Sequence, residues 1–475
     1  MWLIDTKQLI LHYVNNSKDA KYAILSHVWQ TDNEVTFQEF RNRDARHKTG
    51  YAKIFNTCKM ALSHGHNYAW MDTCCINKKS SAELSQAINS MWGWYCDAEV
   101  CYAYLGDVHD DIRPSDDDRT DESSLSWHVN TTTESAPSGG PLEVFCRSEW
   151  FTRGWTLQAI IAPRDVQFYN AAWSYIGRQA EMLHQLSKAT GIDVSALEDR
   201  HNVPCFVAAR KLSWASKRYT TRIEDQAYSL LGLMGVSMPL LYGEGSRAFL
   251  RLQEEILRNT EDQSIFAWEF QEPIKHSHLP CSLFASEPLQ FKQCSKVVAW
   301  DGLHNGEHRL TNRGVTFDEL YFDQDAQLAL LNCRYEDDFR GPIALRIEEW
   351  HQSNGTWLVK RHGGRTTVPD WLHPQILQLT LRRFTSPAVR HSSKLLKLQI
   401  CPHGMNTEAF AIYNAWPRSL WNNGTQVMSR GMPTSEKNAT FTTCLELRTN
   451  GTGKHFWLRI RLVGDGGKYQ FHTVN

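Results

Sequence analysis

This sequence of 475 residues has no stretch of about 18 consecutive apolar residues, so we expect no membrane-spanning helix. It also has no excess of either charge. The 51 Lys and Arg residues oppose 52 Asp and Glu residues, and a net charge of −1 argues against nucleic acid as the partner. The N-terminus has no basic region followed by a long apolar one, so we predict no signal peptide and expect a cytoplasmic protein.

The common nucleotide and metal signatures are missing as well. No Walker-type loop and no Gly-x-Gly-x-x-Gly follows a predicted strand. The twelve cysteines lie mostly in apolar segments, which indicates reduced, buried thiols. The densest group of metal-ligating side chains lacks the usual zinc spacing and consists of Cys58, His64, His66, Cys74 and Cys75. We therefore expect no metal site, while a cysteine nucleophile paired with His27 stays open.

Short apolar runs alternate with runs of helical period over the first hundred residues. Residues 22–28, 68–72 and 99–105 are typical of buried strands. Residues 50–63 and 81–96 lie between them and show the apolar spacing of amphipathic helices. Strands joined by helices through short connections form parallel sheets with right-handed crossovers. We therefore predict an α/β domain with a parallel sheet and flanking helices.

The first domain is predicted to cover residues 1–175. Its last part includes a predicted helix at residues 150–161 and a fourth strand at residues 165–169. Residues 107–141 interrupt the pattern with many acidic residues followed by Ser, Thr, Pro and Gly. A segment of this composition is typical of an exposed or disordered insertion.

Two further regions follow. Residues 176–275 are predicted to be mainly helical. Residues 280–475 change to a period of two, which predicts an antiparallel β-sandwich. Its clearest hairpin pairs residues 440–448 with residues 455–462, and Asn450-Gly451 lies between them as a turn signal.

Polar and aromatic side chains gather where the first two predicted strands end. Ligands bind parallel sheets outside the carboxyl ends of the strands, so these side chains are expected to share one cleft. We assign six of them to substrate binding and the seventh to catalysis. They are Ser26, His27, Trp29, Asp72, Cys74 and Asn77, followed by Glu83.

Several of these residues also fit a structural role. Ser80-x-x-Glu83 matches a capping box, in which the glutamate satisfies the start of its helix. Partial burial of Glu83 would instead raise its pKa and suit it to acid–base or charge-stabilising work. His27 also fits a hydrogen-bonded histidine at a strand end, and Trp29 fits either core packing or a platform for a flat ring. Asp72 also fits a cap of the loop that follows it.

Four segments, in order, resemble the fungal heterokaryon-incompatibility (HET) domain. They are Tyr22-Ala-Ile-Leu-Ser-His-Val-Trp29, Trp70-Met-Asp-Thr-Cys-Cys-Ile-Asn77, Glu83 with Met91 and Tyr95-Cys-Asp-Ala98, and Arg153-Gly-Trp-Thr-Leu-Gln158. Residues 210–216, 222–229 and 238–245 resemble the helical segment that commonly follows this domain. The resemblance covers residues 1–270. The family usually has a glutamate after Trp-Thr-Leu-Gln, whereas this sequence has Ala159, which puts the activity of the site in doubt.

The resemblance implies a role in fungal self/non-self recognition, in which HET domains trigger programmed cell death when unlike cells fuse. HET domains are also remotely similar to TIR domains, which share a flavodoxin-like sheet. Some TIR domains hydrolyse NAD with a glutamate on the helix after a central strand. Glu83 occupies the analogous place by our count of strands and helices. This transfer is a fold-level analogy.

We therefore predict a cell-death effector of vegetative incompatibility that cleaves NAD as a TIR-like NAD nucleosidase. NAD would be a substrate, and no cofactor is expected. Glu83 would stabilise the oxocarbenium-like state, Trp29 would stack on a ring, and Asp72, His27 and Asn77 would orient ribose hydroxyls. Activity is expected to depend on self-association or on a partner protein. The alternative is a non-enzymatic signalling module in which Glu83 only caps its helix and the β-rich domain recognises partners.

Overall fold

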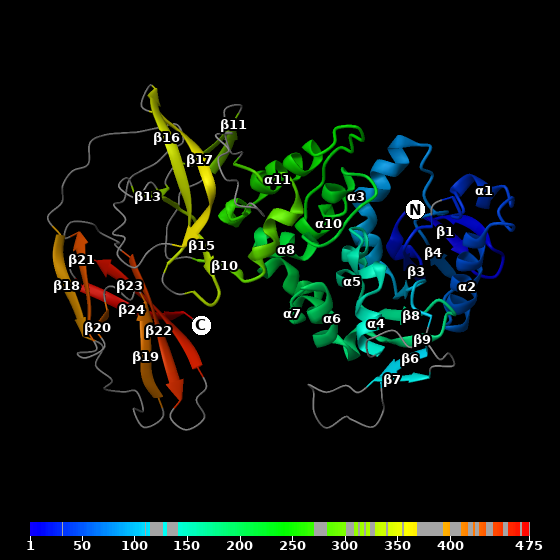
Figure 1. Ribbon diagram of the computed structural model, residues 1–475, viewed down its shortest axis with the longest axis horizontal. Coiled ribbons are helices and arrows are strands. Elements are labelled where there is room, and N and C mark those ends of the chain that lie inside the picture. Colours follow the sequence, from blue (N-terminus) through cyan, green and yellow to red (C-terminus); the bar gives the residue numbers. More distant parts are fainter. Residues whose placement is uncertain are drawn as a thin grey trace. The chain divides into compact units, whose positions relative to one another are not determined.

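The computed structural model describes most of the first 300 residues and a set of strands beyond them. The described ranges are 1–30, 32–109, 111–114, 127–130, 141–269, 283–300, 308–311, 314–317, 320–323, 328–338, 341–353, 356–367, 393–399, 410–416, 421–422, 427–433, 440–449, 455–465 and 468–474. Contacts divide the chain into two units (Figure 1). The first unit comprises Met1–Thr260 with Phe284–Ser295, and the second comprises Glu261–Leu283 with Lys296–Asn475.

The first unit is built on a seven-stranded mixed sheet in the order β2-β1-β4-β3-β5-β8-β9. Its strands are β1 (Trp2–Asp5), β2 (Ile10–Tyr13), β3 (Tyr22–His27), β4 (Tyr68–Trp70), β5 (Val100–Tyr104), β8 (Val166–Tyr169) and β9 (Tyr175–Arg178). The four central strands, β4, β3, β5 and β8, are parallel, and every residue of β3 is buried. The predicted parallel core with helices is therefore confirmed.

The edges of the sheet differ from the prediction. Strands β1 and β2 pair antiparallel with each other, and β1 continues the sheet antiparallel to β4. At the other edge, β9 pairs antiparallel with β8. These edge strands have four residues each, and β2 is mostly exposed, so they carry no long buried run. The prediction of a parallel sheet was therefore wrong at its edges, because pairing with neighbouring strands, and not a local apolar run, forms these short segments.

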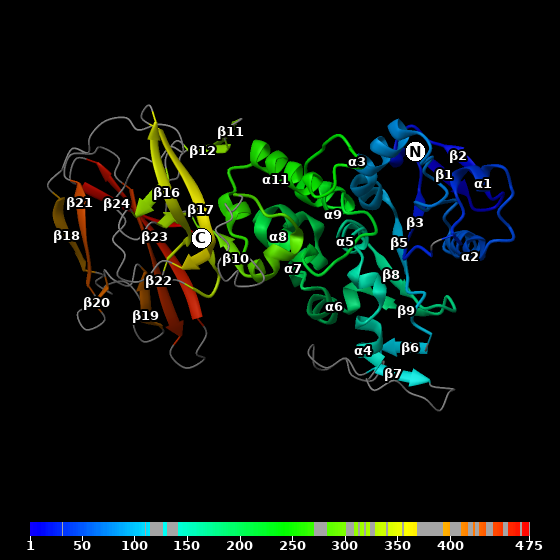
Figure 2. The same cartoon turned by 45° about the horizontal axis from the view of Figure 1, so that its top comes forward.

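Helices cover both faces of the sheet. Helix α2 (Thr49–Ser63) connects β3 to β4, and α3 (Ser81–Asp97) connects β4 to β5. Because β4 and β5 lie on opposite sides of β3, right-handed crossovers place these two helices on opposite faces. Figures 1 and 2 show α2 beside α1 (Phe37–Arg41) on one side, with α3 and α5 (Thr156–Ile161) on the other. Helix α3 is buried along Ala87, Ile88, Met91 and Tyr95, as the periodicity predicted.

The predicted helix at residues 150–161 is interrupted. A 3-10 turn, η2 (Glu149–Thr152), precedes α5, and residues 153–155 separate the two. The Gly154 amide donates to the Tyr219 carbonyl oxygen at 2.9 Å. A Cβ atom at position 154 would lie 2.5 Å from Thr220 Cγ2. The single continuous helix was therefore wrong, because the backbone opens at Gly154 to let another segment approach.

A set of short helices follows the sheet within the first unit. They include α6 (Leu183–Thr190), α7 (Val194–Glu198), α8 (Ala208–Ala215), α9 (Asp225–Tyr228), α10 (Leu231–Met234) and α11 (Arg247–Asn259). The side chain of Asn89 on α3 donates from Nδ2 to the Met238 carbonyl oxygen at 3.3 Å and accepts from the Met238 amide at Oδ1 at 3.2 Å. Gly232 lies so close to Trp92 that an added Cβ would fall 2.1 Å from Trp92 Cβ. Helix α3 thus packs against both the sheet and these helices, while the domain boundary near residue 175 stays a prediction.

The predicted insertion at residues 107–141 holds two described strands. These are β6 (Asp111–Pro114) and β7 (Trp127–Asn130), which pair antiparallel. Within that insertion, residues 110, 115–126 and 131–140 lie outside the described residues. Among the described residues, none of the helices has the length and apolar character needed to cross a bilayer.

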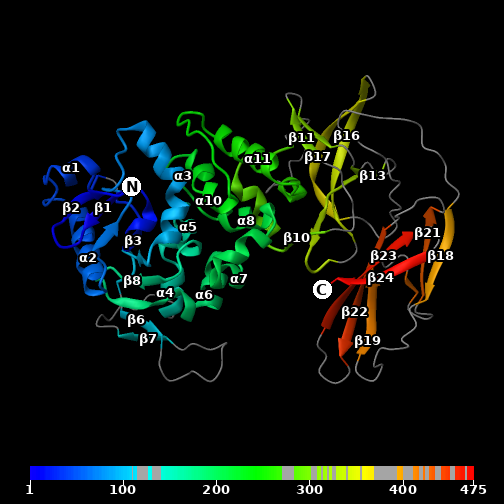
Figure 3. The same cartoon turned by 180° about the vertical axis from the view of Figure 1, so that it is seen from behind.

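The second unit consists of small antiparallel sheets. Its strands are β10 (Val297–Ala299), β11 (His308–Thr311), β12 (Gly314–Phe317), β13 (Tyr321–Asp323), β14 (Leu328–Leu330), β15 (Cys333–Tyr335), β16 (Ile343–Ser353), β17 (Thr356–Thr367), β18 (Ser393–Gln399), β19 (Phe410–Trp416), β20 (Trp421–Asn422), β21 (Val427–Pro433), β22 (Thr440–Thr449), β23 (His455–Asp465) and β24 (Lys468–Val474). Figure 3 shows β22, β23 and β24 side by side. The predicted pairing of β22 with β23 is confirmed, and Arg448 lies opposite His455. Their predicted turn at residues 450–451 lies outside the described residues, and stacking of the sheets into a sandwich stays a prediction.

Candidate functional site

The carboxyl ends of β3 and β4 lie side by side and carry the centre of the candidate site. The two strands are parallel, with Ile24 opposite Trp70. Beyond this pair, β3 runs on to His27, and Trp29 follows it. The chain after β4 turns at Asp72. This register brings side chains from two distant segments to the same edge of the sheet.

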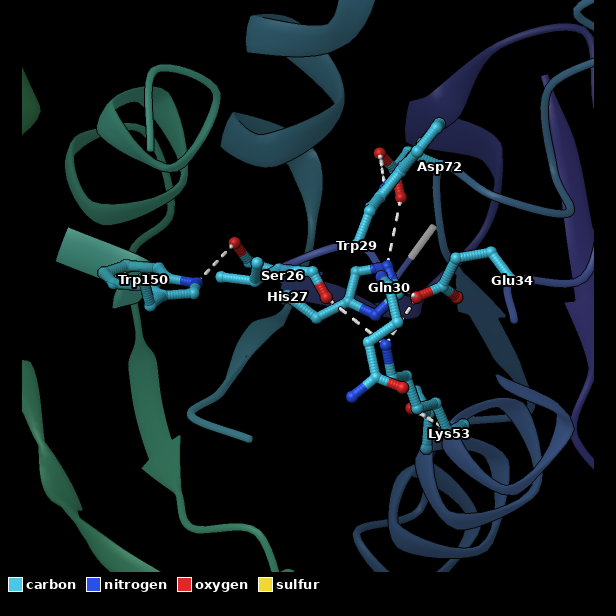
Figure 4. A network of polar contacts seen from close by, with 10 residues as sticks. Ser26, His27, Trp29, Gln30, Glu34, Lys53, Asp72 and Trp150 are labelled. Carbon is cyan, nitrogen blue, oxygen red and sulfur yellow. Dashed lines mark hydrogen bonds and ion pairs between the residues drawn. The ribbon is translucent and has the colours of Figure 1, made fainter. Parts of the chain in front are cut away.

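Asp72 is the central residue of this edge (Figure 4). Its Oδ2 atom accepts a hydrogen bond from Trp29 Nε1 at 2.9 Å. Its Oδ1 atom lies 3.4 Å from His27 Nε2. The His27 side chain is only 1% exposed, the Asp72 side chain is 28% exposed, and Trp29 is 44% exposed. Exposure to solvent therefore increases from His27 through Asp72 to Trp29.

Several polar atoms of this group lack hydrogen-bond partners. The contact between His27 and Asp72 has the distance of an ion pair but not the geometry of a hydrogen bond. Both ring nitrogens of His27 and Asp72 Oδ1 are buried and have no hydrogen-bond partner in the described part of the chain. Buried polar atoms are normally paired, and an unpaired one costs about 1–3 kcal/mol. A polar ligand that reached these atoms could satisfy them.

Lys78 completes the group. Its Nζ atom lies 3.4 Å from the centroid of the Trp29 ring. Burial alone would raise the pKa of Asp72, but His27, Lys78 and Trp29 outweigh this effect and hold the pKa below its ordinary value. Desolvation lowers the pKa of Lys78, and the charge of Asp72 opposes this shift. Asp72 therefore carries its negative charge at neutral pH, and we call His27, Trp29, Asp72 and Lys78 the Asp72 cluster.

Ser26 and Cys74 take other positions. Successive side chains of a strand point to opposite faces of the sheet, so the Ser26 side chain lies on the face opposite to that of His27. The Ser26 hydroxyl accepts a hydrogen bond from Trp150 Nε1 at 3.0 Å (Figure 4). Cys74 is fully buried, and burial raises its pKa well above the ordinary value. It is therefore a protonated thiol, and the roles of Ser26 and Cys74 in substrate binding stay predictions.

Asn77 is held by hydrogen bonds within its own loop and to α1. Its Oδ1 atom accepts from Gln38 Nε2 at 2.6 Å and from the Lys79 amide at 3.3 Å. The side-chain oxygen of Asn77 therefore already accepts two hydrogen bonds from the protein. Its predicted part in orienting ribose hydroxyls is untested.

Glu83 lies in the first turn of α3, as predicted. Its amide donates to Ser80 Oγ at 3.3 Å, which is one half of the predicted capping box. The reciprocal bond to the Glu83 carboxylate is not among the hydrogen bonds of the described residues. The carboxylate lies near the amino group of Met1, where its charge opposes a lowering of that group's pKa by desolvation. The structure records no contact between Glu83 and Asp72 or Trp29 in its described part.

Two lysines that were not predicted from the sequence also lie at this edge. Lys78 lies in the loop beside Asn77, and its side chain reaches Trp29 through folding alone. Lys53 is buried on the inner face of α2, where it contacts Glu34 and donates to the Val28 carbonyl oxygen at 3.3 Å. A charged residue on an otherwise apolar helix face is a signal that could have identified Lys53.

Ala159, where the resembled family has a glutamate, is completely buried in α5. Its neighbour Gln158 contacts Met91 Sδ on α3 through Nε2 at 3.1 Å. Every residue of α5 is buried. Position 159 therefore faces the interior of the first unit.

A metal site and a separate hollow are two other kinds of possible site. Among the described residues, no three His, Cys, Asp or Glu side chains are grouped so that they could hold a metal ion. A hollow of about 520 Å³ lies away from the Asp72 cluster and is lined by Met60, Ser63, His64, Gln167, Tyr169, Trp173, Tyr175, Arg178 and Glu181. Its residues come from α2, β8, β9 and the turns beside them, so no local pattern in the sequence indicates it.

Comparisons with known proteins found two matching family models and a similar protein of known name. Residues 22–159 match the family described as heterokaryon incompatibility protein (HET), and residues 247–305 match a domain of unknown function, DUF8212. Over 243 residues, or 51% of this chain, it is 40% identical to the vegetative incompatibility protein HET-E-1 of Podospora anserina. The matched stretch covers 16% of that protein's length. No solved structure was found to match the chain.

Proposed function

Because this chain carries a HET domain at residues 22–159, we propose that it acts in heterokaryon incompatibility and triggers cell death on non-self recognition. The similarity to a vegetative incompatibility protein supports this role. That relative is much longer than the matched stretch, so its other parts have no counterpart in this comparison. The function is therefore assigned to the HET domain and the helices packed against it.

For the chemistry, we propose that the Asp72 cluster binds NAD and that the HET domain cleaves its nicotinamide–ribose bond. The observation that carries this proposal is the pair of groups without hydrogen-bond partners in the described part of the chain, His27 and Asp72 Oδ1, next to an exposed indole. A nucleotide offers a flat ring for Trp29 and ribose hydroxyls that both donate and accept hydrogen bonds. The order β4-β3-β5-β8, in which the second strand flanks the first, is also typical of flavodoxin-like sheets.

The proposed cleavage balances without a redox partner. The bond between ribose and the ring nitrogen breaks, and its electron pair leaves with nicotinamide, which becomes neutral. Water adds to the oxocarbenium carbon and releases a proton. A carboxylate next to this carbon stabilises the positive charge that develops. Glu83 is the predicted carboxylate, and Asp72 is the one that lies beside the exposed ring.

A second candidate function is a non-enzymatic signalling module. The observation that favours it is the position of Glu83, whose amide is capped by Ser80 and whose carboxylate contacts neither Asp72 nor Trp29 in the described structure. In this reading the HET domain binds a partner protein or a second copy of itself. Cell death would then need no chemistry at the Asp72 cluster.

One experiment separates the two candidates. The purified full chain is incubated with NAD at high protein concentration, and release of nicotinamide is measured. Cleavage predicts turnover that is lost in Glu83→Gln or Asp72→Asn and kept in the exposed control Glu198→Gln. A signalling module predicts no release from any of these proteins. It also predicts that cell death on expression survives Glu83→Gln.

A further inference from the structure

The ring face of Trp29 is occupied by a cation of the protein itself. The Lys78 ammonium lies 3.4 Å from the ring centroid, which is close for a cation over an indole. On the edge of the same ring, Nε1 donates to the Asp72 carboxylate. The position above Trp29 therefore combines an electron-rich ring face with a neighbouring negative charge.

The surrounding charges favour a cation at this position. Desolvation lowers the pKa of Lys78, whereas the carboxylates Asp72 and Glu34 act to raise it and so favour the charged form, and Arg222 acts against them. Lys78 is an exposed residue, and its flexible side chain can carry the ammonium into water. A neutral ring that displaced Lys78 would remove the Lys78 charge from beside Asp72 and put no other charge there. A positively charged ring would replace that charge.

We propose that the position above Trp29 is a subsite for a cationic aromatic ring, an N-substituted pyridinium. In the absence of this ligand, the Lys78 ammonium occupies the subsite. This inference rests on the proposed function, because the oxidised nicotinamide ring of NAD is such a pyridinium and the reduced ring is neutral. The subsite would select the oxidised form through Trp29 and Asp72. Lys78 would compete with the ligand and weaken its binding.

The test measures binding of the N-methylnicotinamide cation and of neutral nicotinamide to the full chain by ligand-observed NMR. The cation is expected to bind the unmodified protein and nicotinamide to bind more weakly. Lys78→Gln is expected to tighten binding of the cation about two- to fivefold, because one competing cation–π contact is removed. Lys79→Gln, in the same exposed loop, serves as the matched control and is expected to leave binding unchanged.

Two further variants examine the ring and the carboxylate. Asp72→Asn is expected to abolish the preference for the cation over nicotinamide. Trp29→Phe keeps a ring but loses the indole bond to Asp72, and it is expected to weaken binding of the cation. Circular dichroism of each variant establishes that the fold is retained.

Three results would overturn the inference. The first is equal binding of nicotinamide and its N-methyl cation. The second is weaker binding of the cation to Lys78→Gln, and the third is an unchanged preference in Asp72→Asn. Binding of the cation without any NAD cleavage would leave the inference standing and remove the proposed reaction. Cleavage of NAD without binding of the cation would remove only the inference.

Discussion

Trp29 and Asp72 are joined by a hydrogen bond of 2.9 Å between the indole Nε1 and a carboxylate oxygen, although 43 positions separate them in the sequence. The bond holds an exposed aromatic side chain in one orientation at the surface. The second oxygen of the same carboxylate faces the buried imidazole of His27. One acidic residue therefore links the interior of the sheet to an exposed ring.

Asp72→Asn is expected to destabilise the folded protein at neutral pH by about 1–3 kcal/mol, because the neutral amide loses charge-assisted interactions. Burial alone would raise the pKa of Asp72, yet His27, Lys78 and Trp29 keep it below its ordinary value. The folded state thus binds this proton less readily than the unfolded state. The stabilisation is present above the ordinary carboxylate pKa of about 4 and is lost as pH falls through the lower value of the folded state.

Urea denaturation of both proteins between neutral and acid pH measures this effect. The stability difference between the unmodified protein and Asp72→Asn should shrink as pH falls. Asp19→Asn, at an exposed position, should show no such trend. A stability difference for Asp72→Asn that stays constant with pH would contradict the expectation.

Gly154→Ala is expected to lower stability by about 1–3 kcal/mol, because the added methyl group would overlap Thr220 Cγ2 at 2.5 Å. Gly93→Ala is its matched control. Gly93 lies exposed within α3, and nothing lies within 4 Å of its added Cβ. The control should gain about 0.5–1 kcal/mol from better helix propensity. Thermal unfolding of both variants measures the shifts, and equal shifts in the same direction would be evidence against close packing at Gly154.

Glu224→Ala is expected to cost about 1–3 kcal/mol, because it leaves two amides without their acceptor. Glu224 Oε1 accepts from Gly243 at 2.7 Å and from Gly245 at 3.1 Å. The pKa of the Glu224 carboxyl group is lowered by hydrogen bonds from its own amide, from the Gly243 amide and from the Gly245 amide. Burial acts in the opposite direction but is outweighed. The contribution should therefore be present at neutral pH and decline in acid. Chemical denaturation measures it, and a loss no larger than that of Glu198→Ala would refute this role.

Cys74 and Cys75 are expected to resist alkylation in the folded protein. Both are buried, and burial raises the pKa of Cys74 well above its ordinary value. Cys205 is exposed and should be modified at once. Mass spectrometry of peptides after brief iodoacetamide treatment identifies the modified residues. Rapid modification of Cys74 would instead indicate an activated nucleophile at this edge of the sheet.

The elements that could be predicted from the sequence are those with strong local patterns. Helix α3 was predicted from the spacing of Ala87, Ile88, Met91 and Tyr95, which are buried together. The buried strands β3, β4 and β5 were predicted from continuous apolar runs. The edge strands β1, β2 and β9 could not be predicted. Each has only four residues, not all of them buried, and so shows too weak an apolar pattern. Gly154 was misread as part of a helix because its close approach to Thr220 comes from a distant segment.

Local patterns in the sequence indicated that the first domain resembles a known family and that its sheet has a parallel core, since motifs and apolar periodicity are local properties of the chain. The sequence also determined which residues stand at the carboxyl ends of β3 and β4. Which of these side chains contact one another depends on the tertiary structure. Strand alternation turns Ser26 toward Trp150, while the register of β3 against β4 brings His27 and Trp29 to Asp72. That register depends on pairing between segments far apart in the chain, which no local pattern encodes.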